Sequence, residues 1–147
     1  MCAPRHSVAS ALRVTGDAGR VLMVQTWNRM GDGLILPGGM VDSGESPMQA
    51  ASREAAEELG LDIQASRLLV IEHRQESDQR PPSIHFVFAA DRIVAENHDL
   101  VLQAEEIAEA HWVNPADLEQ SHVPIGRPRM QAVLRAFTAG APVYLET

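Results

Sequence analysis

The segment 46–61 constrains the fold more than any other part of the chain, because it carries signals for both ends of a helix. Ser46 is a good N-cap, Pro47 suits the first helical position, and Gln49 completes a capping-box pattern. Gly60 stands where a helix-ending glycine belongs. The sequence therefore predicts a helix over residues 47–59, about 20 Å long, between two well-defined ends.

This helix has two faces with different chemistry. An apolar stripe at i+4 spacing is suited to close packing on a sheet. It consists of Ala51, Ala55 and Leu59. The neighbouring stripe carries Glu54, Glu57 and Glu58, which their spacing brings together on one face. Glu54 and Glu58 repel each other by roughly 0.2–0.5 kcal/mol on an isolated helix, and Glu57 and Glu58 lie in the last turn, where the helix dipole disfavours anions.

Local stability alone does not select this arrangement, although Arg53 can offset Glu57 at i, i+4. One interpretation is a solvated acidic face, which is common on protein surfaces. The other is a divalent-cation site, since clustered carboxylate oxygens are the usual ligands of Mg²⁺ or Mn²⁺. The upstream sequence favours the cation site. A tight Leu-Pro-Gly-Gly turn at residues 36–39 leads into a loop with Asp42 and Glu45, which brings another carboxylate and accessible carbonyls to the same region.

The rest of the chain predicts strands interleaved with a second helix. Strands are expected where apolar residues alternate or run together, at residues 8–14, 21–24, 67–74, 84–90 and 111–113. The segment 21–24 is apolar on both faces, so we expect it at the centre of a sheet. An amphipathic helix is expected over residues 128–139. For 147 residues, this pattern indicates a single α/β or α+β domain over residues 1–147.

Charge and composition exclude several classes of function. The net charge of −8 argues against a general nucleic-acid binder, which would carry a basic stripe. All twelve basic residues are arginines, so Schiff-base chemistry and a P-loop lysine are excluded. Cys2 is the only cysteine, which rules out an internal disulfide, and we expect no catalytic role for it. Apolar runs are too short to cross a bilayer and a signal peptide is not evident, so a cytoplasmic location is expected.

The segment 39–61 resembles the Nudix box, the signature of the Nudix (MutT-like) hydrolase family. That signature runs glycine, five residues, glutamate, seven residues, Arg-Glu, an aliphatic residue, any residue, Glu-Glu, any residue, glycine and an aliphatic residue. Every fixed position is matched, and only Ala55 is smaller than the usual aliphatic residue. The matching positions are Gly39, Glu45, Arg53, Glu54, Glu57, Glu58, Gly60 and Leu61. The box covers 23 of the 147 residues, and Glu106, six residues before Trp112, also resembles a recurrent family pattern.

The resemblance implies an α/β/α sandwich around a central mixed sheet, and hydrolysis of a nucleoside diphosphate linked to another moiety. The implied cofactor is Mg²⁺, with Mn²⁺ as an alternative, and water would be the nucleophile. The implied metal ligands are the side chains of Glu54, Glu57 and Glu58 and a carbonyl of Gly38 or Gly39. Arg53 would orient the glutamates through an ion pair, while Glu45 would have a structural or indirect role. The general base varies in this family, so Glu58 and Glu106 are near-equal candidates. Glu57 and Glu58 are both expected to be essential.

The box says little about the substrate, which other loops would determine. We expect a nucleoside triphosphate, a nucleotide sugar or another small diphosphate, with no nucleic-acid or membrane partner. Candidate contacts are one ring that could stack on a base and three arginines that could bind phosphate or ribose. They are Trp27, Arg29, Arg74 and Arg80. The alternative is a non-catalytic Nudix-like domain that senses a ligand, which the intact box disfavours. The sequence does not decide between a monomer and a homodimer.

Overall fold

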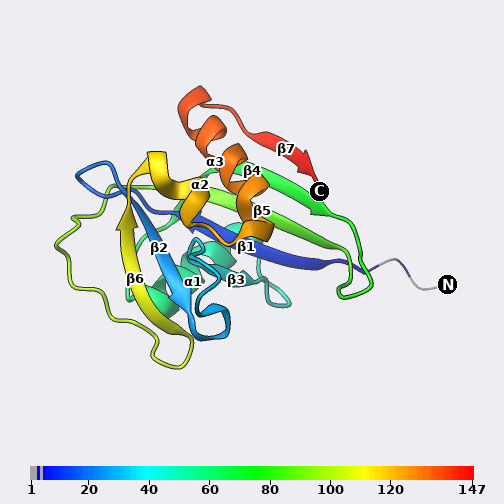
Figure 1. Cartoon of the computed structure of the whole chain (residues 1–147), viewed down its shortest axis with the longest axis horizontal. Helices are drawn as coiled ribbons and strands as arrows, with labels where there is room; N and C mark the ends of the chain where they lie inside the picture. The colour runs from blue at the N-terminus through cyan, green and yellow to red at the C-terminus, as the bar shows by residue number, and fades with distance from the viewer. Residues whose placement is uncertain (1–2, 4) are drawn as a thin grey trace.

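A five-stranded mixed sheet lies at the centre of the fold (Figure 1). Its strands have the order β3–β1–β5–β4–β7. They span Gly38–Met40 (β3), Ser7–Arg13 (β1), Ser83–Ala90 (β5), Ala65–Arg74 (β4) and Val143–Glu146 (β7). The pairs β1–β5 and β4–β7 are parallel, whereas β1–β3 and β4–β5 are antiparallel. The computed structural model describes residue 3 and residues 5–147, so Cys2 lies outside the described residues.

Two further strands, β2 (Val21–Thr26) and β6 (Ile107–Val113), form a separate antiparallel sheet beside the central one (Figure 1). The prediction that residues 21–24 lie at the centre of a sheet is therefore wrong, because β6 is the only strand that pairs with β2 within the described residues. The segment is nonetheless fully buried. Alternate residues of β2 belong to two hydrophobic clusters, one under each helical layer, so burial on both faces arises without a central position.

Helices cover both faces of the central sheet, which confirms the expected α/β/α arrangement (Figure 1). Helix α1 (Pro47–Leu59) packs on β1, β3, β4 and β5, and α3 (Arg127–Ala139) packs on β4 and β7 from the opposite face. A short helix, α2 (Leu118–Ser121), contacts α3. Short 3₁₀ helices lie at Trp27–Arg29, Pro115–Asp117 and Pro124–Gly126. No helix in the described part of the chain is long and apolar enough to cross a membrane.

The two ends of α1 lie where the sequence predicts them. The Ser46 hydroxyl accepts a hydrogen bond from the Gln49 N–H at 3.1 Å, and the Ser46 N–H donates to the Gln49 side-chain oxygen at 2.8 Å. Gly60 ends the helix with a left-handed φ of 67°. The apolar stripe of α1 is fully buried against the sheet. This burial fixes the rotation of the helix, and with it the direction in which the glutamate stripe points.

Most predicted elements are present, but several short ones are not predicted by the sequence. Strands β1, β4, β5 and β6 and helix α3 correspond to the expected segments, with bounds that differ by a few residues. The unpredicted elements are β3, which forms at the glycine turn, β7 in the last residues of the chain, and α2. Strand β3 is the element that matters most for the site, because it lies between β1 and α1.

Candidate active site

Two carboxylates of α1 are buried against the glycine turn at the start of β3. Glu58 is 2% exposed, and its Oε1 accepts a hydrogen bond from the Gly38 N–H at 2.8 Å. The carboxylate of Glu54 lies so close to Gly39 that a Cβ at that position would overlap it. A Cβ at Gly38 would overlap the carbonyl oxygen of Ser10 in β1. The two glycines thus allow β3 to lie between β1 and the glutamates.

Arg53 connects the acidic groups on the outer side of the site. Its guanidinium binds Glu45 in a forked ion pair, with Nη2–Oε1 at 2.7 Å and Nε–Oε2 at 3.0 Å. Nη1 donates to Glu54 at 3.0 Å and to Glu57 at 3.1 Å, and Nη2 donates to the Met40 carbonyl at 3.1 Å. The hydrogen bond to Glu45 is the largest cause of the raised pKa of Arg53. These are the contacts that a role in orienting the glutamates requires.

Burial and crowding disfavour ionisation of the inner carboxylates. Burial raises the pKa of Glu58 to about 8, and the charges of Glu54 and Glu106 act in the same direction while the Gly38 N–H opposes them. Burial also raises the pKa of Glu54, although Arg53 opposes this effect. A bound cation would relieve both costs, because it favours the ionised form of each carboxylate.

The oxygen-rich donor set suits a hard divalent cation such as Mg²⁺. As the side chains stand, however, no group of three His, Cys, Asp or Glu residues within the described residues is arranged to hold a metal ion. The side chain of Glu57 is 48% exposed and paired with Arg53. Ligation by Glu54, Glu57 and Glu58 together would require Glu57 to turn from this ion pair toward the inner carboxylates. Metal binding by the three glutamates therefore stays a prediction.

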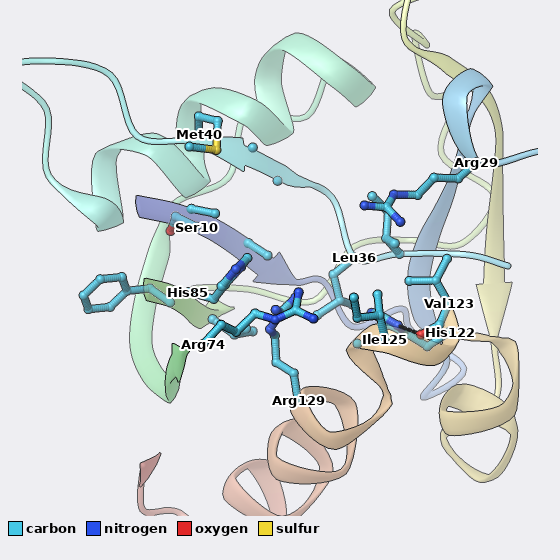
Figure 2. Close-up of a pocket in the computed structure, with 18 of the residues that line it drawn as sticks. Ser10, Arg29, Leu36, Met40, Arg74, His85, His122, Val123, Ile125 and Arg129 are labelled. Carbon is cyan, nitrogen blue, oxygen red and sulfur yellow. Dashed lines mark hydrogen bonds between the residues drawn. The ribbon is translucent and has the colours of Figure 1, made fainter. Parts of the chain in front are cut away.

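Two cavities adjoin these residues and share part of their walls. The glutamate cavity has a volume of about 460 Å³. Its lining residues are Thr26, Trp27, Asn28, Arg29, Ile35, Gly38, Glu58, Glu105 and Glu106. The arginine cavity, of about 400 Å³, lies beside α3 (Figure 2), and its charged or ionisable lining residues are Arg29, Arg74, His85, His122 and Arg129. Four residues line both cavities: Asn28, Arg29, Ile35 and Gly38.

The candidate base and the candidate substrate contacts are divided between these cavities. Glu106 and Trp27 line the glutamate cavity. Trp27 is 55% exposed, and its indole N–H donates to a backbone carbonyl at 2.8 Å, so one edge is anchored while the ring remains accessible. Arg29 lines both cavities, and Arg74 lines the arginine cavity. Arg80 lies in the loop between β4 and β5 and lines neither of them.

Three ionisable residues of the arginine cavity are not predicted as site residues by the sequence: Arg129, His85 and His122. Arg129 of α3 forms an ion pair with Glu72 of β4 at 2.5 Å. Burial lowers the pKa of both histidines to about 4, and Arg129 acts in the same direction. Both rings are therefore neutral near pH 7. The one sequence signal was Glu72 itself, a carboxylate in the otherwise apolar run at residues 68–72, which indicates a buried cationic partner.

Comparison with known proteins identifies the family. The NUDIX domain model matches residues 4–137. An uncharacterized Nudix hydrolase of Rhodococcus erythropolis is 31% identical over 123 residues, covering 77% of this chain and 65% of that protein. An 8-oxo-dGDP phosphatase of Danio rerio is 33% identical over 93 residues, covering 63% of this chain and 27% of that protein. The MutT protein from Methanosarcina mazei Go1 has the same fold, with a TM-score of 0.74, 19% identity, and coverage of 95% and 99% of the two chains.

The mixed sheet between helical layers is the fold that this chain shares with the matched solved structure. The chain belongs to the Nudix family, as the box at residues 39–61 predicts. It spans less than two thirds of the length of both curated relatives.

Proposed function

We propose that this Nudix hydrolase uses Mg²⁺ to cleave the diphosphate linkage of a small nucleotide, in which a nucleoside diphosphate is joined to another moiety. The observation that carries the proposal is the burial of Glu54 and Glu58, which are 9% and 2% exposed. A solvated acidic face would leave its carboxylates in water, where their ionisation costs nothing. Glu58 instead lines a cavity of about 460 Å³, which is within the size range of small-molecule sites.

The residues of the site would divide the work as follows. Glu54, Glu57 and Glu58 would hold Mg²⁺, with a backbone carbonyl of the glycine turn completing the set. When bound, the ion would neutralise the diphosphate and lower the pKa of a bound water. Arg53 keeps Glu54 and Glu57 oriented through its contacts at 3.0 and 3.1 Å. Glu106 is exposed in the same cavity, so it is free to accept the proton of the attacking water while Glu58 serves as a ligand.

The adjoining cavities favour an extended substrate that occupies both. Trp27 offers an accessible ring on which a base can stack. Arg29 lines both cavities, and in this proposal its guanidinium would contact a phosphate between them. The Danio rerio relative is, by its name, a phosphatase of an oxidised nucleoside diphosphate. Nucleoside diphosphates, nucleoside triphosphates and nucleotide sugars are therefore the compounds to test first.

The test is a panel of these compounds incubated with the protein and Mg²⁺, with the products identified by chromatography. We expect pyrophosphate from a triphosphate, or two monophosphates from a nucleotide sugar. Glu57→Gln should lower kcat on the preferred compound by orders of magnitude with the fold intact, because it removes a metal ligand. Glu109→Gln, which changes an exposed glutamate of β6, is the matched control and should retain turnover.

The outcomes of this panel test the metal assignment and decide between hydrolysis and ligand sensing. Near-wild-type turnover by Glu57→Gln would overturn the metal assignment. Turnover of no compound with either Mg²⁺ or Mn²⁺, together with retained nucleotide binding in calorimetry, would replace hydrolysis by the ligand-sensing function.

A further inference from the structure

The arginine cavity brings together guanidinium groups from three separate elements. Arg74 is the last residue of β4, Arg129 lies in the first turns of α3, and Arg29 ends the 3₁₀ helix after β2. Figure 2 shows Arg74 and Arg129 extending into the same space beside His85, with Arg29 on the opposite wall. Like charges held this close are costly unless an anion lies between them.

The protein supplies only part of the negative charge that these arginines need. Glu72 is fully buried, forms the 2.5 Å ion pair with Arg129, and accepts a hydrogen bond from the Thr147 hydroxyl at 2.7 Å. Arg74 is 9% exposed and has no ion pair with any described carboxylate. Three guanidinium groups and one carboxylate leave two positive charges at this cavity, in a chain whose net charge is −8.

The hydrogen-bonding capacity of the same groups is also incompletely used. Within the described residues, the buried Nε of Arg74 and the buried Nη2 of Arg129 have no hydrogen-bond partner. The Nε of Arg80, in the loop behind Arg74, is likewise buried and without a partner there. Buried polar groups are normally paired, and each unpaired one costs free energy comparable to a lost hydrogen bond. Two of these donors belong to side chains that line the cavity, so a ligand with several acceptor oxygens would satisfy them.

The remaining ionisable groups do not supply a counter-charge. His85 and His122 are neutral near pH 7, because burial and the neighbouring arginines lower their pKa to about 4. Burial lowers the pKa of Arg74 as well, and the charges of Arg80 and Arg129 add to that effect. The positive charge of the cavity is therefore built at an energetic cost, which an anionic ligand would offset.

We propose that the arginine cavity binds a phosphomonoester, carried by the substrate at the end opposite to the diphosphate that is cleaved. A phosphomonoester carries up to two negative charges and three acceptor oxygens at neutral pH, which matches the two unbalanced positive charges. Planar guanidinium groups bind such oxygens in pairs. The location at the far end of the substrate rests on the proposed function, whereas the binding of phosphate by the cavity does not.

Inorganic phosphate in the presence of EDTA tests the cavity without metal or turnover. We expect the midpoint of thermal unfolding to rise by roughly 3–5 °C when phosphate is present at about ten times its Kd. Phosphate also stabilises proteins generally by exclusion from their surface, so the informative quantity is the part of the rise that Arg74→Gln removes. Arg135→Gln is the matched control, because Arg135 lies on α3 and is exposed.

Loss of the specific rise in Arg74→Gln, its retention in Arg135→Gln and partial retention in Arg74→Lys would support the proposal. A rise that is equal in wild type and Arg74→Gln would overturn it. An equal specific rise with succinate would assign the cavity to carboxylates, and a rise with guanosine but none with phosphate would assign it to a base. Either of these results also overturns the proposal. Calorimetric titration of phosphate into each variant keeps the test valid if Arg74→Gln alters the melting temperature on its own.

A matched pair of dinucleotides tests the position of the phosphomonoester relative to the diphosphate. NADP⁺ and NAD⁺ share a diphosphate linkage and differ by one phosphomonoester. With Mg²⁺, we expect wild type to show a KM about ten- to a hundredfold lower for NADP⁺. Arg74→Gln should lose that difference, and the exposed control Arg135→Gln should keep it. An equal KM in wild type would place the phosphate elsewhere. If neither compound is hydrolysed, the proposed reaction is in question, while the phosphate titration in EDTA still decides the binding proposal.

Discussion

Without metal, ionisation of Glu58 should destabilise the folded protein as the pH rises. The ordinary pKa of this carboxyl is 4.5, and burial raises it to about 8 in the folded chain. Below pH 4.5 the group is protonated in both the folded and the unfolded state, so it costs nothing. Between these two values the unfolded chain releases the proton while the folded chain retains it, so the free energy of unfolding falls. At 1.36 kcal/mol per pKa unit, the loss by about pH 8 is about 4 kcal/mol.

Glu58→Gln isolates this effect, because the amide keeps the Oε1 that accepts from the Gly38 N–H and removes the charge. In urea unfolding with EDTA, we expect the variant to be more stable than wild type at about pH 8, by up to about 4 kcal/mol, and nearly equal at about pH 5. Glu76→Gln, an exposed position between β4 and β5, should follow wild type. Mg²⁺ should stabilise wild type at about pH 8 more than Glu58→Gln. A variant no more stable than metal-free wild type at this pH would refute the burial argument.

Two further substitutions test separate parts of the structure. Glu106 is exposed, so Glu106→Gln should change the free energy of unfolding by less than about 0.5 kcal/mol. If Glu106 is the general base, the same substitution should lower kcat by about 10²- to 10⁴-fold. An unchanged kcat would instead assign the role of general base to Glu58. Arg129→Gln leaves Glu72 buried without its ion pair, and urea unfolding at neutral pH should show a loss of about 3–5 kcal/mol. Burial alone would raise the pKa of Glu72, but Arg129 and Thr147 hold it below its ordinary value. This stabilisation should therefore disappear as the pH falls through the lowered pKa, and equal stability of wild type and Arg129→Gln at neutral pH would contradict it.

The part of the site that the sequence predicts is the part built from local interactions. The capping residues, the apolar stripe and the glutamate spacing of α1 are all contained within sixteen consecutive residues, and local hydrogen bonds fix both helix ends. A continuous apolar run in β4 and an alternating pattern in β5 likewise suffice to predict these two strands, each of which pairs with a neighbour on both sides. Family membership is predicted from an overlapping segment, because residues 39–61 match the whole Nudix signature within 23 consecutive residues.

The part that the sequence does not predict depends on partners far along the chain. Strand β3 has three residues, two of them glycine, and forms because β1 and α1 hold it on both sides. Strand β7 pairs in parallel with β4, more than seventy residues earlier. The arginine cavity combines residues 29, 74 and 129, each of which is an ordinary basic residue in its own segment. Only packing shows that Arg74 and Arg129 are buried together whereas Arg80, equally attractive in the sequence, stays outside the cavity.

The two cavities have opposite charge, and this polarity affects how a substrate with two anionic ends would bind. The exposed carboxylates of Glu105 and Glu106 line one cavity, so phosphate oxygens are repelled there until a cation offsets the negative charge. The arginine cavity attracts phosphate without any metal. A phosphomonoester would therefore hold the substrate at one end while Mg²⁺ and the reacting diphosphate bind at the other. Because binding at linked sites is reciprocal, any gain in substrate affinity from Mg²⁺ must equal the gain in Mg²⁺ affinity from the substrate. Mg²⁺ held by the buried glutamates and a phosphomonoester held by the arginine cavity would then each favour the binding of the other through the shared substrate.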